Sequence, residues 1–484
     1  MHVHLTGVSG TGMGALAALF REAGHRVTGS DVAFDPPIGP ALEAAGVECL
    51  RGWDASHLEP APDLVVIGNA IRRDNPEAAF ARERGLRATS MSAALREHFL
   101  AGRRPLVVAG THGKTTTSAM CAWALSVAER EPGWFIGGLP KNLPAGAHVG
   151  STKRRLDHKT PFVVEGDEYD AVYWHKKPKF LDYVGVSDDD VVIVTSVEHD
   201  HVDIYPDEAS YVAAFADLAR AVPEKGLIVC DASSPLSART MLEHARARVS
   251  FYALDGDATG DVTPTWIAAP APVDAESGIQ PFDVFGAGAS CGRFTTKVPG
   301  LHNVRNALAT IAACTEGLDA PIGKVRVALA SFEGVRRRQD LLGVPRGVRV
   351  YDDFAHHPTA VDETLRALRA RHPSGSLWAV FEPRSATACR NLHQEAYTRA
   401  FGAADHVLLA PLGRTNVPEA ERLDTARLAR ELGEKGEALA TVDAIVERVA
   451  GGARAGDTVA LLSNGSFAGL HGRLMAALEA AVPR

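Results

Sequence analysis

The sequence predicts an α/β protein of several domains, each built around a mostly parallel sheet. Three observations predict this fold class. The chain has 484 residues, of which 46% are hydrophobic and 23% charged, a composition close to average globular usage and a length that suits about three domains. Short apolar strands alternate with helical segments along the whole chain. Two of these strands run directly into glycine-rich turns that open helices, an arrangement typical of doubly wound sheets.

Composition also excludes several classes of protein. The net charge is −8, so the chain has no basic stripe for a nucleic-acid backbone. Apolar runs such as Leu64–Gly68 are far shorter than the roughly 20 residues that a membrane helix needs, and the segment Met1–Leu5 does not resemble a secretory signal. The six cysteines form no Cys-x-x-Cys pair, which favours reduced thiols over disulfides or a zinc site. We therefore expect a cytoplasmic protein with neither nucleic-acid nor membrane partners.

The first predicted domain covers residues 1–104. A strand at Val3–Thr6 leads through a glycine turn into a helix at Ala15–Ala23, and a second strand ends at Asp31. The turn from Gly10 to Ala15 fits G-x-G-x-x-G/A, in which glycine lets the backbone approach a pyrophosphate at a helix N-terminus. The motif does not distinguish NAD from a UDP-sugar, and a turn without a ligand is the alternative.

The second predicted domain covers residues 105–334 and contains a second glycine-rich turn, from Gly110 to Thr117. It follows an apolar strand and opens an alanine-rich helix. Backbone amides can hold phosphates here, Lys114 can reach the β- and γ-phosphate oxygens, and Thr115 can ligate Mg²⁺. We expect strands at Pro105–Gly110, Phe162–Glu165, Val191–Ser196 and Leu227–Cys230 and helices at Glu208–Ala221, Asn303–Cys314 and Gly323–Ser331, while Phe251–Pro299 suggests either a small antiparallel sheet or a flap.

Acidic loops follow two strands of this domain. They run from Glu165 to Asp170 and from Glu198 to Asp203, at the strand ends where α/β sheets place their ligands. Because Mg²⁺ prefers oxygen ligands, Glu165 is the first predicted metal ligand. His201 is predicted to hold a second metal or to orient its water shell. The alternative is a pair of solvated acidic loops.

The third predicted domain covers residues 335–484 and repeats the alternation. Its first strand leads into Asp352–Pro358, where paired carboxylates precede paired histidines, a combination that packing alone does not explain. Two further segments accompany it. Arg336–Arg338 suits either phosphate binding or surface ion pairs, and exposed amides in His302–Asn306 suit the edge of an adenine.

These motifs together resemble the Mur ligases, the ATP-dependent amide-forming family of bacterial cell-wall synthesis. The resemblance covers nearly the whole chain, in order, and rests on the N-terminal glycine turn and on segments 110–115, 165–170, 198–201, 302–306, 336–338 and 352–358. It implies an N-terminal Rossmann-like UDP-binding domain, a central P-loop ATPase domain and a C-terminal Rossmann-like domain that binds peptide. It also implies that the lactyl carboxylate of UDP-N-acetylmuramate attacks the γ-phosphorus of ATP, and that an amine then displaces phosphate from the acyl phosphate.

Three details favour one branch of the family. Asn69 and Ala70 after Gly68, Tyr169 in the acidic motif and the segment Glu382–Ser385 are more similar to the branch that adds the tripeptide L-Ala-γ-D-Glu-meso-diaminopimelate in peptidoglycan recycling. The branch that adds L-alanine in peptidoglycan synthesis is the alternative. Outside the family, the alternatives are an NAD-dependent oxidoreductase and an ATP-binding regulatory protein.

The resemblance assigns the following roles, with ATP and Mg²⁺ as cofactors and a monomer or weak homodimer as the assembly. Catalysis is assigned to Lys114, Glu165, His201, Asp353 and His356, and the metal to Thr115, Glu165 and His201. ATP binding is assigned to Gly110, Thr111, His112, Gly113, Lys114, Thr115, Thr116, Asn303, Asn306, Arg338 and Asp353. The UDP-sugar is assigned to Gly10, Thr11, Gly12, Met13, Gly14, Ser30, Asp31, Asn69 and Ala70, and the peptide to Arg384, Ser463 and Asn464.

Overall fold

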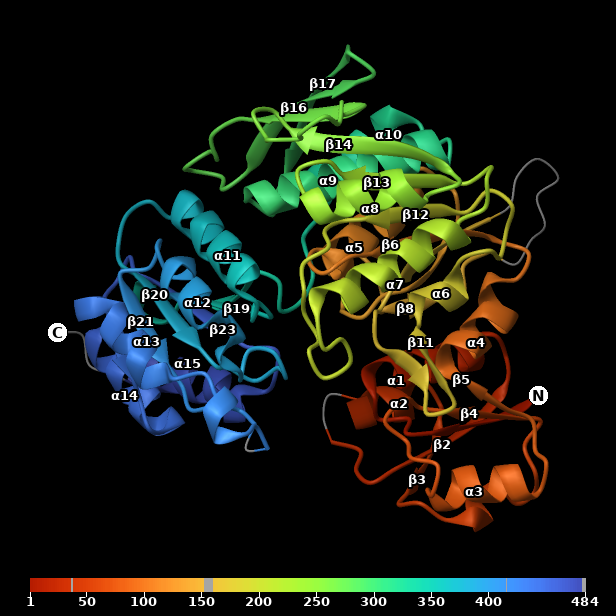
Figure 1. The fold of residues 1–484 in the computed structure, drawn as a ribbon. Coiled ribbons are helices and arrows are strands. Elements are labelled where there is room, and N and C mark those ends of the chain that lie inside the picture. The colour runs from red at the N-terminus through yellow and green to blue at the C-terminus, as the bar shows by residue number, and fades with distance from the viewer. Residues whose placement is uncertain (36–37, 152–159, 415, 481–484) are drawn as a thin grey trace. The chain divides into compact units, whose positions relative to one another are not determined.

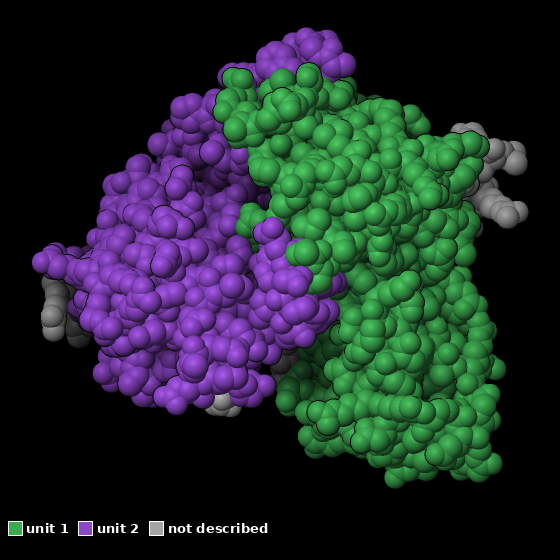
Figure 2. All heavy atoms as spheres, viewed as in Figure 1, with its two compact units in different colours: residues 1–198, 209–267, 307–328 green, residues 199–208, 268–306, 329–484 purple. Residues whose placement is uncertain are grey.

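The computed structural model describes residues 1–35, 38–151, 160–414 and 416–480. Its contacts divide the chain into two compact units, which Figure 2 colours separately. The first unit contains Met1–Glu198, Ala209–Ile267 and Ala307–Ala328, and the second contains His199–Glu208, Ala268–Asn306 and Leu329–Arg484. Among the described residues, no helix is long and apolar enough to cross a membrane, and all six cysteines are free thiols.

The first unit begins with a parallel sheet (Figure 1). Its strands are β1 (His2–Thr6), β2 (Arg26–Asp31), β3 (Glu48–Arg51), β4 (Leu64–Ile67) and β5 (Ala88–Ser90), and its helices are α1 (Thr11–Glu22), α2 (Ile38–Ala44), α3 (Pro76–Glu83) and α4 (Met91–Leu95). The strands pair in the order β3-β2-β1-β4-β5. Because the order reverses between β1 and β4, the segments that follow these two strands flank the switch point where such sheets bind ligands.

A second, larger sheet lies in the first unit, together with a small antiparallel pair of β10 (Asp170–Val172) and β11 (His175–Pro178). Its strands are β6 (Arg104–Ala109), β7 (Gly133–Phe135), β8 (Ala147–His148), β9 (Pro161–Glu165), β12 (Val191–Val194), β13 (Leu227–Asp231) and β14 (Arg248–Leu254). Within the unit they pair in the order β14-β13-β12-β6-β9-β7-β8. The main helices are α5 (Lys114–Val127), α7 (Glu208–Ala221), α8 (Pro235–His244) and α10 (Ile322–Ser331). The central strand β6 is fully buried over Leu106–Ala109, as expected for a continuous apolar strand covered on both faces.

The second unit contains a sheet of its own. Its strands are β18 (Asp340–Gly343), β19 (Arg349–Asp353), β20 (Leu377–Phe381), β21 (His406–Leu409), β22 (Gly436–Ala438) and β23 (Thr458–Leu462). They pair in the order β18-β19-β23-β20-β21-β22, with β18 antiparallel at the edge. The helices are α11 (Pro358–Arg371), α12 (Gln394–Ala400), α13 (Thr425–Glu431), α14 (Val442–Gly452) and α15 (Leu470–Ala480).

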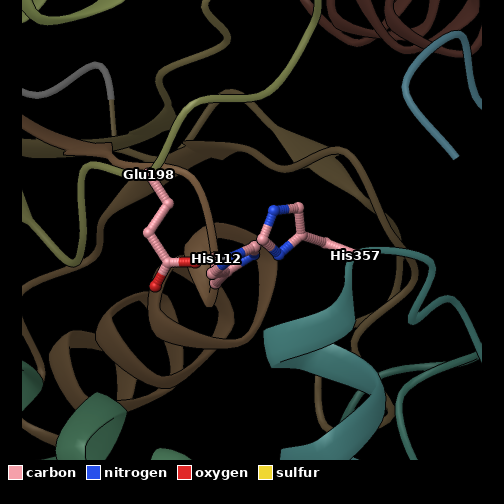
Figure 3. Close-up of side chains that lie close together, drawn as sticks. All are labelled: His112, Glu198 and His357. Carbon is pink, nitrogen blue, oxygen red and sulfur yellow. Dashed lines mark hydrogen bonds and ion pairs between the residues drawn. The ribbon is translucent and has the colours of Figure 1, made fainter. Parts of the chain in front are cut away.

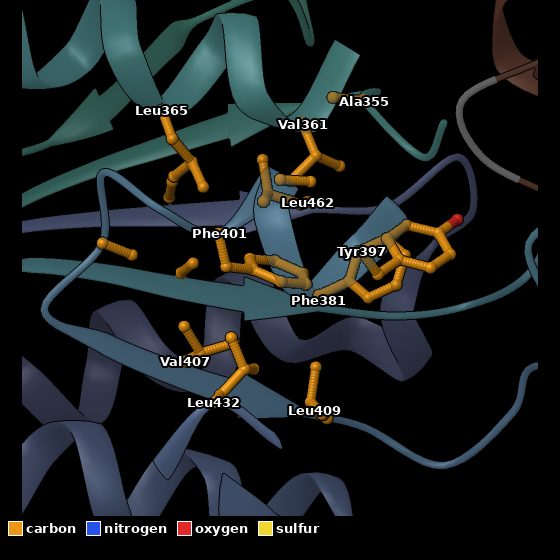
Figure 4. Packing of buried hydrophobic residues seen from close by; sticks show 14 of the residues in the cluster. Ala355, Val361, Leu365, Phe381, Tyr397, Phe401, Val407, Leu409, Leu432 and Leu462 are labelled. Carbon is orange, nitrogen blue, oxygen red and sulfur yellow. The ribbon is translucent and has the colours of Figure 1, made fainter. Parts of the chain in front are cut away.

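Strand β20 shows how the sequence pattern builds the core of this sheet. Leu377, Ala379 and Phe381 pack into one apolar cluster, and Trp378 and Val380 pack into another. Side chains alternate between the two faces of a strand, so a strand that is apolar at every position supplies both faces. Figure 4 shows the first cluster, in which side chains of α11 and α12 pack against one face of the sheet.

The predicted fold class is confirmed, with differences at element boundaries. Helix α1 begins at Thr11 rather than Ala15, because the last glycines of the turn already adopt helical backbone. The expected change of pattern at Phe251 is wrong, since Phe251 lies inside β14, which pairs in parallel with β13. The later part of that stretch forms an antiparallel hairpin of β16 (Gln280–Gly286) and β17 (Ala289–Thr296), in agreement with a small antiparallel element.

Candidate active site

The phosphate loop joins the central strand β6 to helix α5. Gly110 has a φ of 126°, and a Cβ at this position would lie 2.2 Å from Thr195 Oγ1. Gly113 has a φ of 78° and forms the N-cap of α5. Glycine is required at both positions because L-residues with side chains avoid this backbone region. The loop therefore presents its amides at the N-terminus of a long helix, where phosphate binds favourably.

Lys114 is the first residue of α5, and its ammonium lies inside the loop. Nζ donates to Gly110 O at 2.6 Å and lies 2.9 Å from Glu168 Oε1. Burial lowers the pKa of Lys114, but the nearby Glu168 carboxylate more than compensates, so the pKa is raised. The lysine is thus held charged at the position where the sequence predicts triphosphate.

Glu165 ends β9 beside the same helix. Its Oε1 accepts a hydrogen bond of 2.8 Å from the Thr115 hydroxyl, and its Oε2 accepts one of 2.7 Å from Gly137 N. β9 pairs in parallel with β6, so the ends of these strands place Glu165 next to the start of α5. Hydroxyl and carboxylate oxygens are the ligands that Mg²⁺ prefers. Thr115 and Glu165 therefore fit the predicted metal site.

The loop that follows β12 also contacts the phosphate loop. β12 pairs with β6 on the side opposite to β9. His112 Nε2 lies 3.2 Å from Glu198 Oε2, and the two side chains point toward one another in Figure 3. His112 N donates to Ser196 Oγ at 3.1 Å. Thr111 Oγ1 accepts from Glu198 N at 2.9 Å. The loop after β12 therefore braces the phosphate loop through both backbone and side-chain contacts.

Tyr211, on α7, was not selected from the sequence. Its hydroxyl lies 3.0 Å from Thr111 Oγ1 and donates to Glu168 Oε1 at 3.2 Å. It links the phosphate loop to the carboxylate that partners Lys114. A tyrosine within an amphipathic helix has no sequence signature of such a role, and only the packing of α7 against the sheet reveals it.

The N-terminal glycine turn lies between β1 and α1. Ser9 N donates to Asp31 Oδ2 at 2.9 Å, so the carboxylate at the end of β2 orders the turn. A Cβ on Gly12 would lie 2.8 Å from Met91 Sδ, which shows how closely the turn approaches α4. Asn69 and Ala70 follow β4 and are exposed. Since β1 and β4 are parallel neighbours, both segments lie at the edge predicted to bind the UDP-sugar.

Glu77 organises the interior of this domain and was also missed by sequence reasoning. The side chain is fully buried at the start of α3. It accepts hydrogen bonds from Ser30 at 2.6 Å and Thr6 at 2.7 Å, and His57 Nδ1 lies 2.8 Å away. The Ser30 hydroxyl, assigned to the UDP-sugar, therefore faces inward. In the sequence, a glutamate after Asn-Pro indicates only the start of a helix. Its buried role could not be predicted, because its partners Thr6, Ser30 and His57 lie far apart along the chain.

In the second unit, Asp200 and the His-His-Pro segment lie together. Asp200 Oδ2 is 3.9 Å from His356 Nε2, and the carboxylate is 4% exposed. Burial raises the pKa of Asp200, but His201, His356 and His357 hold it well below its usual range. His201 has a φ of 54°, a backbone conformation unusual outside glycine. The strain is located at a predicted metal ligand.

Asp353 lies buried at the end of β19. Its carboxylate accepts backbone hydrogen bonds from Gln339 at 2.7 Å and Ala355 at 2.8 Å. Burial raises the pKa of Asp353, although Arg338 and these hydrogen bonds oppose the shift. The Arg338 guanidinium lies 4.5 Å from the centre of the Phe354 ring. Arg338 and Asp353 are thus neighbours, and their role toward the nucleotide stays a prediction.

The amides of α9 (Leu301–Ala312) differ from expectation. Asn303 and Asn306 are 5% and 6% exposed rather than open to solvent. Asn303 Nδ2 donates to Pro299 O at 3.0 Å, and Asn306 Nδ2 donates to Asn303 Oδ1 at 3.3 Å. Their amide groups are thus bonded to one another and to the carbonyl of Pro299, which precedes the helix. The expectation of exposed amides is wrong, and their role toward adenine stays a prediction.

The three residues assigned to the peptide come from two adjacent strand ends. β20 and β23 pair in parallel, which places Arg384 and Ser463 at the same edge. Arg384 Nη1 lies 3.6 Å from Glu382 Oε1. The Ser463 hydroxyl is fully buried and donates to Glu382, so it supports the site from within. Asn464 Oδ1 is buried and has no hydrogen-bond partner among the described residues.

Comparison with known proteins finds one family along most of the chain. Three family models match in succession: the catalytic domain of the Mur ligase family over residues 2–103, the Mur ligase middle domain over 108–314 and the glutamate ligase domain over 337–465. These models parallel the three domains expected from the sequence, whereas contacts alone separate two units.

Individual relatives give the same result. The chain is 36% identical to the UDP-N-acetylmuramate–L-alanyl-γ-D-glutamyl-meso-2,6-diaminoheptandioate ligase of Escherichia coli K12, over 98% of both chains. It is 38% identical to the UDP-N-acetylmuramate–L-alanine ligase of Kineococcus radiotolerans, over 84% of this chain and 80% of that protein. A crystal structure of a murein peptide ligase from Psychrobacter arcticus matches with a TM-score of 0.71 and 33% identity, covering 100% of both chains. The chain belongs to the Mur ligase family.

Proposed function

We propose that this protein uses ATP to join the tripeptide L-Ala-γ-D-Glu-meso-diaminopimelate to UDP-N-acetylmuramate, in the recycling of peptidoglycan in the cytoplasm. The observation that carries the reaction type is the phosphate loop that leads into α5 at Lys114, together with Glu165 at the end of β9, whose Oε1 lies 2.8 Å from the Thr115 hydroxyl. ATP and Mg²⁺ would be the co-reactant and cofactor, and a monomer or weak homodimer is the expected assembly.

The choice of acceptor rests on coverage. The tripeptide ligase of Escherichia coli aligns over 98% of both chains, whereas the L-alanine ligase of Kineococcus radiotolerans aligns over 84% of this chain at a similar identity. Among full-length structural matches, a murein peptide ligase is 33% identical to this chain, whereas the L-alanine ligase of Thermotoga maritima is 22% identical and supports the fold alone. L-Alanine addition is the second candidate, because this chain is 38% identical to the L-alanine ligase and 36% identical to the tripeptide ligase.

The chemistry explains the need for the phosphate loop. A carboxylate is a poor electrophile, so the lactyl carboxylate oxygen first attacks the γ-phosphorus and ADP leaves. The peptide amine then attacks the carbonyl carbon of the acyl phosphate, and inorganic phosphate leaves. The protein must hold crowded anions in line, and preorganised charge provides most of such catalysis.

The described residues suit that task. The phosphate loop ends at the N-terminus of α5, and the Lys114 ammonium lies within the same loop, where it donates to Gly110 O. Mg²⁺ held by Thr115 and Glu165 would neutralise phosphate charge, since both residues offer oxygen ligands. Glu168 and Tyr211 hold Lys114 and Thr111 in position. Roles for His201, Asp353 and His356 in the same reaction are part of the proposal.

The direct test compares acceptors. The protein is supplied with ATP, Mg²⁺ and UDP-N-acetylmuramate, and phosphate release is measured with either the tripeptide or L-alanine, with the product identified by mass. We expect a kcat/KM at least about a hundredfold higher for the tripeptide. Preference for L-alanine contradicts the proposed acceptor, and phosphate release that is independent of any acceptor contradicts the ligase reaction.

A further inference from the structure

A surface pocket of the second unit lies apart from every residue assigned above. It has a volume of about 480 Å³ and is formed by the segment around α12 and by the segment that leads into α13. Its lining includes Arg399, Arg422 and Arg427, together with Glu395 and Asp424. Pockets of this size suit small ligands, and the mixture of charges suits a ligand that carries several carboxylates and an ammonium group.

Two of the arginines have guanidinium N–H groups without a hydrogen-bond partner among the described residues. The Arg399 side chain makes no hydrogen bond or ion pair with any described residue. Among the residues that the structure describes, the Arg422 side chain donates only through its Nε, to Val417 O at 2.9 Å, so its two terminal nitrogens have no partner there. Arg427 differs, because its Nε donates to Glu431 Oε1 at 2.6 Å. A guanidinium with free terminal nitrogens can bind a carboxylate through two parallel hydrogen bonds.

Helix α12 connects this pocket to the His-His-Pro segment. Its buried Tyr397 donates a hydrogen bond of 2.6 Å to His356 O. The ring of His393, just before the helix, lies 4.7 Å from the ring of His357. Glu395 and Arg399 stand one turn apart on the exposed side of the helix. The pocket and the histidines therefore contact the same short helix.

The spacing suits an extended peptide. At 1.5 Å per residue, Arg399 lies about 7.5 Å along the helix axis from Gln394, the residue that follows His393 and begins α12. An extended tripeptide with one γ-linkage reaches on the order of 12 Å from its amine to its far carboxylates. A peptide whose amine lies near His356 is therefore long enough to extend along α12 to the level of Arg399.

The chemistry of the ligand completes the argument. Beyond its reactive amine, L-Ala-γ-D-Glu-meso-diaminopimelate carries a D-glutamate carboxylate, two diaminopimelate carboxylates and one ammonium. L-Alanine carries one carboxylate, next to the amine. We infer that the pocket binds the acidic far end of the peptide, with Arg399 and Arg422 holding carboxylates and Glu395 or Asp424 facing the ammonium. This inference rests on the proposed function and identifies the part of the chain that reads the acceptor.

Charge reversal tests the inference in the full-length protein. In Arg399→Glu and Arg422→Glu we expect KM for the tripeptide to rise at least about tenfold, while KM for ATP and for UDP-N-acetylmuramate changes less than about twofold. Arg430→Glu is the matched control, because Arg430 is exposed on α13 and is absent from the pocket lining. It changes the net charge equally and should leave KM for the tripeptide unchanged.

A peptide with one carboxylate fewer tests whether the arginines bind carboxylates of the ligand. With L-Ala-γ-D-Glu-L-Lys, which lacks one carboxylate, the penalty of at least one of the two substitutions should shrink severalfold relative to the diaminopimelate peptide. An unchanged KM in both pocket variants, or an equal rise in Arg430→Glu, overturns the pocket inference and leaves the proposed function intact. A wild-type protein that uses L-alanine but not the tripeptide overturns both.

Discussion

The Lys114 ammonium lies 2.9 Å from Glu168 Oε1, and the same carboxylate oxygen accepts a hydrogen bond from the Tyr211 hydroxyl. One buried acidic side chain thus joins the phosphate loop, the acidic loop after β9 and helix α7. The arrangement keeps the lysine charged despite its burial, because the carboxylate offsets the loss of water.

Replacing the lysine separates the two nucleotide sites. In Lys114→Ala, phosphate release that depends on ATP and acceptor should fall by about 10²–10³-fold or more, since one preorganised cation is lost from the transferred phosphoryl group. Binding of UDP-N-acetylmuramate, measured by calorimetry, should remain within about twofold because the N-terminal glycine turn is untouched. An equal loss of both would show that the loop is misassigned.

Removing the carboxylate should change the pH profile. In Glu168→Gln, burial still lowers the pKa of Lys114, while the largest opposing contribution is lost. The lysine then loses its proton at a lower pH, so kcat/KM for ATP should begin to fall at a lower alkaline pH than in the wild type. Asp217→Asn, which removes an exposed carboxylate from the same helix as Tyr211, is the control. Coincident profiles between pH 7 and pH 10 would argue against the Lys114–Glu168 pair.

Gly110 should tolerate no side chain. In Gly110→Ala, the new Cβ would lie 2.2 Å from Thr195 Oγ1 at a φ of 126°, so we expect a destabilisation of more than about 3 kcal/mol or a displaced loop without ATP binding. Gly102→Ala is the matched control, since its φ is 77° but its Cβ would meet nothing within 4 Å. It should cost about 1–2 kcal/mol. Urea unfolding and ATP titration distinguish the two variants.

Glu77 should make stability depend on pH. Burial alone raises the pKa of Glu77, but hydrogen bonds from His4, Ser30 and His57 lower it to about 2 from an ordinary value of 4.5. Because the pKa of Glu77 is lower in the folded than in the unfolded protein, its charge stabilises the fold at pH values above 4.5. This stabilisation is lost as the pH falls toward the folded pKa of about 2.

The magnitude can be measured with the isosteric amide. Glu77→Gln should lower the free energy of unfolding by on the order of 3 kcal/mol at pH 7, and its difference from the wild type should narrow as the pH falls below 4.5 toward 2. Urea unfolding at pH 7, 4 and 3 provides the comparison. A difference that stays constant over this range would mean that the charge of Glu77 contributes nothing.

Arg384 should affect the acceptor alone. Its guanidinium lies beside Glu382 at the end of β20 and is 43% exposed. Arg384→Ala should raise KM for the tripeptide about tenfold, the loss of one charged hydrogen bond, without changing KM for ATP. An unchanged KM for the tripeptide would remove Arg384 from the peptide site.

Local motifs explain what the sequence could predict. Lys114, Thr115 and Glu165 were identified because each lies at a strand end or within a glycine-rich turn, and the parallel pairing of β6 with β9 then brings them together. Glu77 and Tyr211 could not be identified in this way, since their partners lie on other elements and no spacing along the chain records the contact.

The same limit applies to the peptide pocket and to the amides of α9. Arg399 and Arg422 belong to different segments, and their common pocket appears only when α12 packs beside α13. Asn303 and Asn306 have the spacing of one helix face, but spacing alone does not reveal that their amides are buried and bonded to Pro299 and to one another. The predicted start of the first helix is wrong for a related reason. A glycine turn can continue directly into a helix, and α1 therefore begins at Thr11 rather than at Ala15.

Isotope transfer tests the central claim most directly. UDP-N-acetylmuramate labelled with ¹⁸O in its lactyl carboxylate is incubated with ATP, Mg²⁺, the protein and the tripeptide, and the released phosphate is analysed by mass. If the carboxylate attacks the γ-phosphorus and the peptide amine displaces the resulting phosphate, each phosphate released carries one oxygen from the carboxylate. Unlabelled phosphate, formed together with the amide product, would contradict the account.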